Sequence, residues 1–309
     1  MNLFLTGASG LVGSAFARAA ARRGHRVTGT VGTFAGQIEG VGTQLTVDLS
    51  QEAAVTGAVL EVFPDAIVNC AAVSVPEQCE ADPARAQALN VELPALLARL
   101  AHHVSARLIH VSSEQVFDGT GTTLYAATDR PNPINLYGRQ KLASERAVHA
   151  AAPEFAATVR APLLMGNSAG GARSPHERLL ADWAAGRTPR LFQDELRQPC
   201  SAENLAEVLL ELCERRDLLG VFHWAGRELL SRHDIGVRLR EHFKLTATQA
   251  PLDRIARADH PEAVRKRPAR LSLDCTPLVG KLKTRPQTFA DQLGELHVPP
   301  PCRTWYSSL

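Results

Sequence analysis

The stretch LFLTGASGLVGSAFA, residues 3–17, contains the pattern that decides the fold. Gly7, Gly10 and Gly13 follow a short apolar run and open an Ala- and Arg-rich segment at 11–23. Glycines at this spacing permit a tight turn, close approach of a pyrophosphate to the backbone, and close packing of a helix on a strand. The first turn of such a helix points free N–H groups at the anion. The stretch therefore predicts a strand, a dinucleotide-binding turn and a helix, in that order.

The same alternation of short apolar runs and helical stretches continues through the first half of the chain. Because the runs are apolar on both faces, they indicate a parallel sheet covered by helices on both sides. The predicted class is therefore α/β, with a doubly wound parallel sheet. The expected strands are 2–6, 26–30, 44–47, 66–70, 107–112 and 156–161, and the expected helices are 11–23, 84–103 and 135–151.

Beyond Pro162 the rhythm becomes less regular and predicts a second, smaller lobe. We expect a dinucleotide-binding domain over 1–162 and a mixed lobe over 163–309, mainly substrate-binding and interleaved with the sheet. The elements expected after Pro162 are helices at 177–186, 202–214 and 233–243 and strands at 190–192 and 220–224.

Composition and charge exclude several classes of protein. The 309-residue chain is 45% apolar and 21% charged with a net charge of +2, which gives no reason to expect nucleic acid as a partner. Its six cysteines contain no C-x-x-C pair, so neither a disulfide framework nor a metal site is expected. No signal peptide or membrane-spanning run is recognised, so we expect a cytoplasmic protein without a membrane partner. Whether the chain forms a homodimer is open at this stage.

Several positions outside the glycine turn bear on how a dinucleotide would be held. From Met1 to Ile38 the chain has no acidic residue, although a carboxylate about 20 residues after the glycines is what grips the ribose of NAD. This absence favours NADP, with NAD as the alternative. Asp48 either accepts from the adenine or caps a helix beginning near Ser50. Asn90 either bridges strands or is an ordinary helix residue.

A tyrosine–lysine pair supplies the elements of ketone reduction. Tyr137 stands four residues before Lys141 in NLYGRQKLASE, so both side chains share one face of the helix expected at 135–151. Alone, this could be an ordinary surface pair. However, a tyrosine can donate a proton to a carbonyl oxygen, and a neighbouring ammonium is expected to lower its pKa from near 10. Hydroxyls at Ser112 and Ser113 follow the fifth strand, where ligands of open α/β sheets bind, and can hydrogen-bond the same oxygen.

These motifs together resemble the extended short-chain dehydrogenase/reductases and, within them, the dTDP-4-dehydrorhamnose reductase family. The resemblance implies a Rossmann fold, NADP as cofactor, and a nucleotide-linked 4-keto-6-deoxy sugar held between the lobes. The segments that carry it are TGASGLVG (6–13), NCAAVSVPEQCEADPARAQALNVE (69–92), VSSEQVFDG (111–119), NLYGRQKLASE (135–145), VFHWAGRELLSRHDI (221–235) and RPARLSLDC (267–275).

The resemblance also implies roles for individual residues. Ser113, Tyr137 and Lys141 take the catalytic positions, and Ser74, Glu114 and Gln115 would face the substrate. Arg197 and Arg267 are candidates for a clamp on the substrate diphosphate, because a planar guanidinium suits phosphate oxygens. The residues bordering the cofactor would be Gly7, Ser9, Gly10, Leu11, Val12, Asp48, Leu49, Ala71 and Ala72, together with Tyr137 and Lys141.

Two departures from the family pattern leave the particular sugar open. Gln115 and Leu163 stand where rhamnose-forming reductases have an aromatic residue and a tryptophan. The same family contains the regulatory β subunit of methionine adenosyltransferase, which the chain resembles at 221–235. A regulatory subunit that keeps the dinucleotide site is therefore a second hypothesis. A third is a sugar-nucleotide epimerase or dehydratase, although the Gln115 amide cannot shuttle the proton that a dehydratase carboxylate would.

Overall fold

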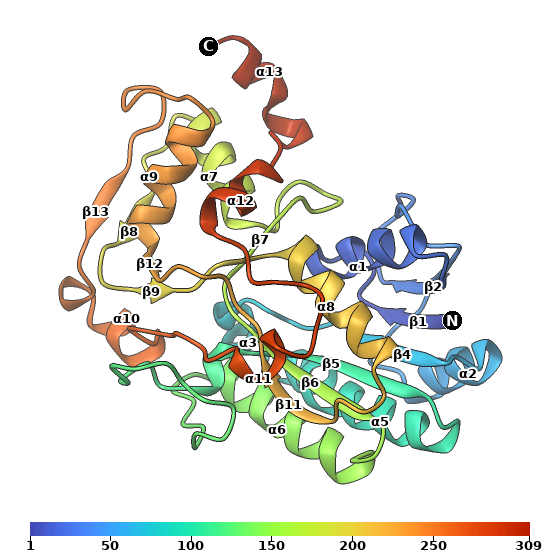
Figure 1. Ribbon diagram of the computed structural model, residues 1–309. Helices are drawn as coiled ribbons and strands as arrows, with labels where there is room; N and C mark the ends of the chain where they lie inside the picture. The colour runs from blue at the N-terminus through green and yellow to red at the C-terminus, as the bar shows by residue number, and fades with distance from the viewer.

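A seven-stranded parallel sheet forms the centre of the larger lobe in the computed structural model, which describes residues 1–309 (Figure 1). Its strand order is β11-β6-β5-β4-β1-β2-β3, and every neighbouring pair is parallel. The order reverses between β1 and β4, and ligands of such sheets bind at the carboxyl ends of the strands beside this switch point. The strands are β1 Asn2–Thr6, β2 Arg26–Val31, β3 Thr43–Thr46, β4 Ala66–Asn69, β5 Arg107–Ser113, β6 Ala156–Ala161 and β11 Gly220–His223.

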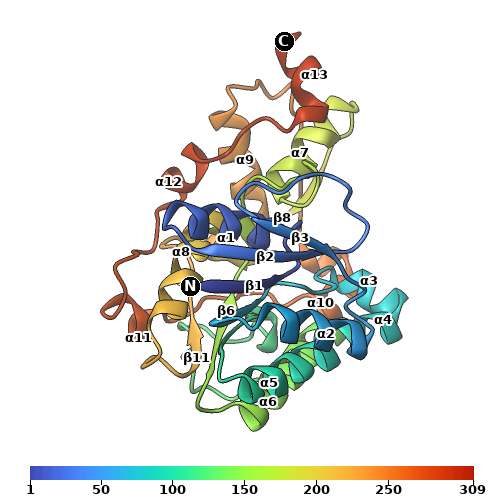
Figure 2. The same cartoon turned by 90° about the vertical axis from the view of Figure 1, so that its right-hand side faces the viewer.

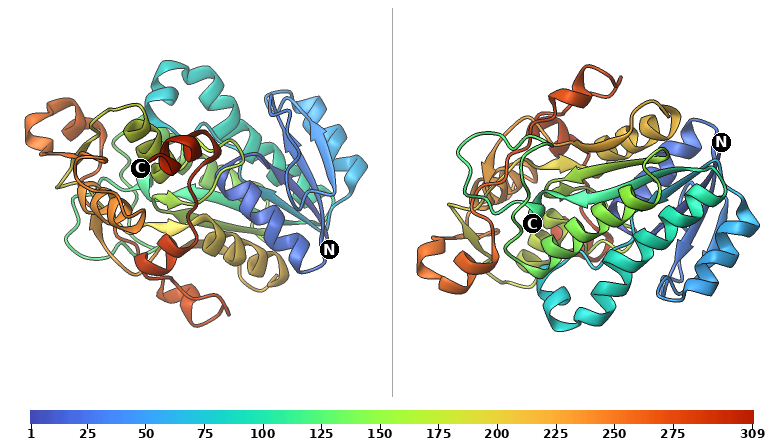
Figure 3. Two further views of the ribbon diagram at one scale, coloured as in Figure 1. Left: turned by 90° about the horizontal axis from the view of Figure 1, so that it is seen from above. Right: turned by 90° about the horizontal axis from the view of Figure 1, so that it is seen from below.

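Helices cover both faces of this sheet (Figure 2). On one face α1 (Leu11–Arg22) packs against α8 (Ala202–Glu214), and alanines on the buried side of α1 let it lie close to the strands. On the other face lie α2 (Glu52–Val62), α5 (Leu93–His103) and α6 (Leu136–Ala151). The views from above and below in Figure 3 show this layering from the two sides, with α5 and α6 adjacent.

The smaller lobe is built from separate stretches of the second half of the chain (Figure 1). Its helices pack around an apolar core that includes Trp183, Leu239, Phe243 and Phe289. Between its stretches the chain returns to the larger lobe to form α8 and β11. The helices of the smaller lobe are α7 Pro175–Ala184, α9 Arg232–His242, α12 Phe289–Gly294 and α13 Arg303–Ser307. The short strand pairs are β7 Leu164–Met165 with β10 Cys200–Ser201, β8 Arg190–Phe192 with β13 Asp253–Ile255, and β9 Leu196–Arg197 with β12 Leu230–Ser231.

Short helical elements complete the connections between these layers. They are α3 Pro76–Ala81, α4 Pro83–Gln87, a π-helical turn Ala88–Glu92, α10 Pro261–Lys266, α11 Thr276–Val279, and 3₁₀ turns at Glu114–Val116, Arg257–Asp259 and Pro300–Cys302. None of the protein's helices is long and apolar enough to cross a membrane.

The expected α/β class and doubly wound parallel sheet are confirmed, and the differences are local. The helical region expected at 84–103 is three consecutive elements, with a π-helical turn in the middle. The strand expected at 220–224 is an edge strand of the main sheet, parallel to β6. The interpretation of Asp48 as a helix cap is wrong, because α2 begins at Glu52 and the Asp48 carboxylate instead accepts hydrogen bonds from the backbone and hydroxyl of Ser50.

A buried arginine joins the sheet to α8 at the end of the lobe far from the carboxyl ends of the strands. Arg107, at the start of β5, is 1% exposed and has no carboxylate partner. Its guanidinium donates to the carbonyl oxygens of Phe155 and Leu212 at 3.1 Å each, and also to that of Leu218. Burial lowers its pKa to about 10, which still leaves it charged at neutral pH. Arg107 therefore supplies donors to the Leu212 and Leu218 carbonyls, whereas the Phe155 carbonyl also accepts from the Leu108 N–H.

Arg107→Leu should lower the free energy of unfolding by about 3 kcal/mol, because it leaves the buried carbonyls of Leu212 and Leu218 without a donor. Arg99→Leu is the matched control, since the Arg99 side chain is 56% exposed and pairs only with the exposed Glu52. That control should change the free energy by less than about 0.5 kcal/mol. Urea unfolding followed by circular dichroism measures both, and equal midpoints for the two variants would contradict the role assigned to Arg107.

Candidate active site

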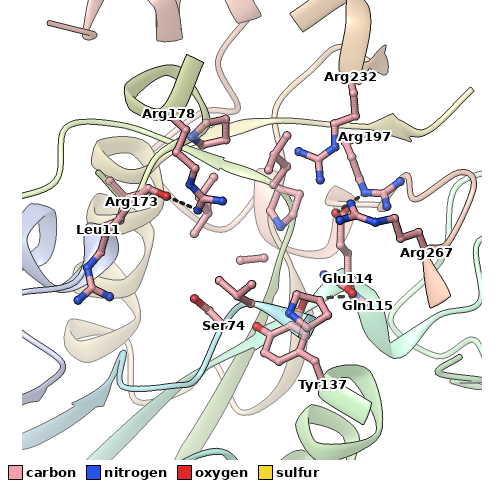
Figure 4. A pocket seen from close by; sticks show the side chains of 18 of the residues that line it. Leu11, Ser74, Glu114, Gln115, Tyr137, Arg173, Arg178, Arg197, Arg232 and Arg267 are labelled. Atoms are coloured by element: carbon pink, nitrogen blue, oxygen red, sulfur yellow. Dashed lines mark hydrogen bonds and ion pairs between the residues drawn. The ribbon is translucent and has the colours of Figure 1, made fainter. Parts of the chain in front are cut away.

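A cavity of about 560 Å³ lies between the two lobes, above the carboxyl ends of the sheet strands (Figure 4). The first turn of α1 and the segments that follow β4 and β5 line it from the larger lobe. Residues of α7, β8, β9 and α9 line it from the smaller lobe. The lining therefore combines the position expected for ligands of an open parallel sheet with a second surface from the other lobe.

The glycine turn at the start of α1 has the shape that a dinucleotide pyrophosphate needs. Gly7 has a φ of 68°, and a Cβ at this position would lie 2.8 Å from the backbone of Ala71. A Cβ at Gly13 would meet the Gly7 carbonyl oxygen. The first turn of α1 carries no acidic residue, and its N-cap is Gly10, which has no side chain that could cap the helix. Its N–H groups are therefore free of competing carboxylates, which fits a bound phosphate.

Ser113, Tyr137 and Lys141 converge on the floor of this cavity. Ser113 ends β5, and Tyr137 lies in the first turn of α6. The N-cap Asn135 fixes the start of α6, because its side chain accepts from the Gly138 N–H at 2.8 Å. The Lys141 Nζ donates to the Val111 carbonyl at 2.9 Å and lies 5.9 Å from the centre of the Tyr137 ring.

Burial shifts the pKa values of Tyr137 and Lys141 in directions that their four-residue spacing did not predict. It raises the pKa of Tyr137 above its usual value of 10, and the neighbouring Ser113 hydroxyl offsets only part of that effect. Burial also lowers the pKa of Lys141 to about 8. The expected lowering of the tyrosine pKa by the ammonium is therefore wrong for the protein alone. Tyr137 therefore holds its proton firmly at neutral pH.

Buried polar contacts fix the elements that carry these residues. Asn90, in the π-helical turn, accepts from the Val73 N–H at 2.9 Å and donates to the Gln140 side chain at 3.0 Å. It therefore bridges the segment after β4 to α6, and does not join two strands. Beneath Ser113, the buried carboxylate of Glu145 accepts from the Ser112 hydroxyl at 2.5 Å. A π-helical turn at a functional site is a common arrangement.

Three arginines on one side of the cavity are paired with acidic residues (Figure 4). The fully buried Glu195 meets Arg232 at 2.8 Å, Arg197 at 3.2 Å and Arg267 at 3.6 Å. Arg197 also meets Glu114 at 3.2 Å, and Arg267 meets Glu77 at 2.7 Å. The two arginines expected to clamp a diphosphate therefore do line the cavity, but their charges are largely compensated.

Two further arginines, which the sequence interpretation missed, lie on the opposite side of the cavity near Leu11 (Figure 4). Arg173 and Arg178 both line the cavity, and neither meets a carboxylate. Buried Glu177 shapes the loop that carries Arg173, because it accepts from the N–H groups of Ser168 and Arg173 at 2.7 Å each, whereas Arg178 lies in α7. The available signal was Ser174-x-x-Glu177, a capping box that marks the start of α7.

The structure brings most of the sequence-predicted residues to this one cavity. Five of them do not line it: Gly7, Ser9 and Ala71 belong to the turn and the adjoining segment after β4, while Asp48 and Leu49 follow β3 farther along the sheet. Those that do line it are Gly10, Leu11, Val12, Ala72, Ser74, Ser113, Glu114, Gln115, Tyr137, Lys141, Arg197 and Arg267.

Comparison with known proteins gives a consistent result. Residues 1–298 match the family model described as the RmlD substrate binding domain. A probable low-salt glycan biosynthesis reductase of Haloferax volcanii is 33% identical over 304 residues, which cover 96% of this chain and 97% of that protein. The methionine adenosyltransferase 2 subunit beta of Xenopus laevis is 34% identical over 238 residues, which cover 75% of this chain and 69% of that protein.

A solved structure shows that the fold is shared. The dTDP-4-dehydrorhamnose reductase of Bacillus anthracis, in complex with NADP, matches with a TM-score of 0.81 at 18% identity. The match covers 94% of this chain and 96% of that one.

Gly13→Ala should weaken dinucleotide binding at least about tenfold, because the added methyl group displaces the Gly7 carbonyl and opens the turn. Gly57→Ala is the matched control: Gly57 lies inside α2, and a Cβ there meets nothing within 4 Å. The control should bind normally and gain up to about 1 kcal/mol of stability. Titration of NADPH fluorescence measures binding, and unchanged affinity in Gly13→Ala would rule out this turn as the binding site.

Proposed function

This chain belongs to the RmlD substrate binding domain family, that of the dTDP-4-dehydrorhamnose reductases, and from this premise we propose that it is an NADP-dependent reductase of a nucleotide-linked 4-keto-6-deoxy sugar. The observation that carries the proposal is the convergence of Ser113, Tyr137 and Lys141 on one cavity with the glycine turn. The Haloferax reductase, matched along nearly its whole length, supports a reductase.

The side chains have distinct parts in this reaction. NADPH, when bound, would supply a hydride to the carbonyl carbon. Tyr137 would give its proton to the carbonyl oxygen, while the Ser113 hydroxyl donates a hydrogen bond to the same oxygen as charge develops. Lys141 would stabilise the resulting tyrosinate, because an ammonium beside a buried phenolate offsets the cost of burying that charge.

The cofactor would lie along the carboxyl ends of β1 and β4. The N–H groups at Leu11 and Val12 would hold its pyrophosphate, because the Gly10 N–H already donates to the Gly7 carbonyl. The acid-free stretch from Met1 to Ile38 supports NADP over NAD, because no carboxylate there repels a 2′-phosphate. The Bacillus anthracis reductase with the same fold was solved with NADP.

The unpaired arginines are the better candidates for the substrate diphosphate. Arg197 and Arg267 would have to give up Glu114, Glu195 or Glu77 to bind phosphate. Arg178 gives up only a hydrogen bond to the Arg173 carbonyl. We therefore place the diphosphate by Arg173 and Arg178, and the sugar beside Ser74, Glu114 and Gln115, between the diphosphate and Tyr137.

A regulatory subunit is the second candidate function. Its support is the 34% identity to the methionine adenosyltransferase 2 subunit beta of Xenopus laevis. Such a subunit would use the dinucleotide site without hydride transfer. The two functions differ in outcome: a reductase oxidises NADPH when given a 4-keto sugar nucleotide, whereas a regulatory subunit forms a stoichiometric complex with its adenosyltransferase and oxidises none.

Tyr137→Phe should lower kcat for ketone reduction by about 10²–10⁴-fold, because it removes only the proton-donating hydroxyl. NADPH affinity should change little, since the ring and Lys141 stay in place. Steady-state NADPH oxidation over a panel of nucleotide-linked 4-keto sugars gives kcat, and fluorescence titration gives the affinity. Full turnover in the Phe variant would show that another group donates the proton.

Arg178→Ala should raise KM for the sugar nucleotide about ten- to hundredfold, because a charge-assisted hydrogen bond contributes about 1.5–3 kcal/mol. Arg187→Ala is the control, since Arg187 is an exposed arginine beyond the end of α7 that pairs with Asp182. It should leave KM nearly unchanged. A large rise in KM for Arg267→Ala, with none for Arg178→Ala, would move the diphosphate to the other side of the cavity.

A further inference from the structure

Glu114 holds an unusual position beside the residues proposed for reduction. It follows Ser113 directly, in the 3₁₀ turn after β5, and its side chain lines the cavity although it is only 3% exposed. Figure 4 shows it close to Gln115 and Tyr137. One carboxylate oxygen, Oε1, lies 3.2 Å from the Arg197 Nε. The other, Oε2, is buried and accepts no hydrogen bond.

The two buried carboxylates of the cavity differ in how well their charges are compensated. Glu195 is surrounded by three arginines, which hold its pKa at about 2 against the effect of burial. Glu114 shares Arg197 with Glu195 and is stabilised less by Arg232 and by the Leu163 N–H, so burial raises its pKa to about 7. Two carboxyl groups whose environments separate their pKa values in this way have separate roles: one stays ionised, and the other can take up and release a proton. An unpartnered carboxylate oxygen beside a reacting centre has no structural bond to lose when it does so.

The cavity also contains a means of stabilising an enolate. During reduction, the Ser113 and Tyr137 hydroxyls would stabilise the negative charge that develops on the carbonyl oxygen. The same hydroxyls would stabilise the same charge if a proton left the neighbouring carbon. Resting on the proposed function, we propose that Glu114 is a second base of this site, which removes and returns the proton on the carbon next to the substrate ketone. The protein then exchanges that hydrogen with solvent as well as reducing the ketone.

The step is balanced without a redox partner. The Glu114 carboxylate accepts the proton, the C–H bond breaks, and its electron pair forms the C=C bond of an enolate. The former carbonyl oxygen carries the negative charge between Ser113 and Tyr137. Once the Glu114 carboxyl has exchanged its proton for a deuteron from solvent, return of that deuteron to the same face restores the ketone with its configuration retained. Nothing is oxidised or reduced.

The test uses dTDP-4-keto-6-deoxyglucose in D₂O with NADP⁺ in place of NADPH, so that reduction cannot consume the substrate. Proton NMR follows the signals of the hydrogens next to the ketone, with a protein-free sample as background. The wild-type protein should exchange one of them well above background. Glu114→Gln should lower the ratio of the exchange rate to the reduction rate by about 10²-fold or more, since general base catalysis contributes about 10²–10⁴-fold.

Glu77→Gln is the matched control, because Glu77 lines the same cavity but is exposed and paired with Arg267. It should keep the wild-type ratio of exchange to reduction. Wild-type reduction without exchange above background would overturn the inference, as would a wild-type ratio in Glu114→Gln. Exchange that depends on Glu114 without reduction of any sugar would keep the inference and contradict the proposed function.

The pH dependence of hydrogen exchange tests the role of Glu114 in the wild-type protein, without any variant. The charged or titratable side chains that act on Glu114 are Arg197 from β9, Arg232 from α9, Glu195, and Tyr137 from α6. The ionised carboxylate is the base, so the exchange rate should rise as pH increases through about 7 and then level off. A rate that is flat or falls between about pH 5.5 and 8 would contradict the inference.

Discussion

The close approach of α6 to the carboxyl end of β5 is the contact on which the site depends. It is possible because residue 138 is glycine, since a Cβ there would meet the Gln115 carbonyl. Two further contacts hold it: the Lys141 Nζ donates to the Val111 carbonyl, and the Glu145 carboxylate accepts from the Ser112 hydroxyl. Together they turn one face of a helix toward the end of one strand. If α6 moved outward, the Tyr137 and Ser113 hydroxyls would separate, and both side chains would become exposed to solvent.

The two sides of the cavity differ in how far the charges of their arginines are compensated by carboxylates. On one side Glu77, Glu114 and the fully buried Glu195 pair with three arginines in a cluster whose charges are largely compensated. On the other side Arg173 and Arg178 face the cavity without carboxylates, and so remain available to an anion. Charge that is already compensated contributes little to binding a phosphate, whereas uncompensated guanidinium groups gain most when one arrives. An anion is therefore expected to bind on the side of the cavity formed by Arg173 and Arg178.

Local patterns predicted the larger lobe well. The glycine spacing at 7, 10 and 13 and the Tyr137–Lys141 spacing each depend on one turn or one helical period, so the sequence carries them directly. Properties that depend on distant segments could not be predicted. Arg197 meets Glu114 and the Pro268 carbonyl, which lie far from it in the sequence, and the pKa of Tyr137 depends on how deeply α6 is buried. Arg173 and Arg178 were missed because only the folded chain brings the loop held by Glu177 and the start of α7 to the cavity.

The most direct test of a hydride-transferring reductase is to follow the hydride itself. Incubation of the protein with NADPH deuterated at the transferable position of the nicotinamide, and with each of several nucleotide-linked 4-keto-6-deoxy sugars, allows NMR and mass spectrometry to locate the label. The account predicts one deuterium at C4 of the product sugar, on the carbon that gains the hydroxyl, and labelling at least about a hundredfold slower after Tyr137→Phe under the same conditions. Label that stays in the dinucleotide with every sugar, in protein that binds NADPH, would contradict it.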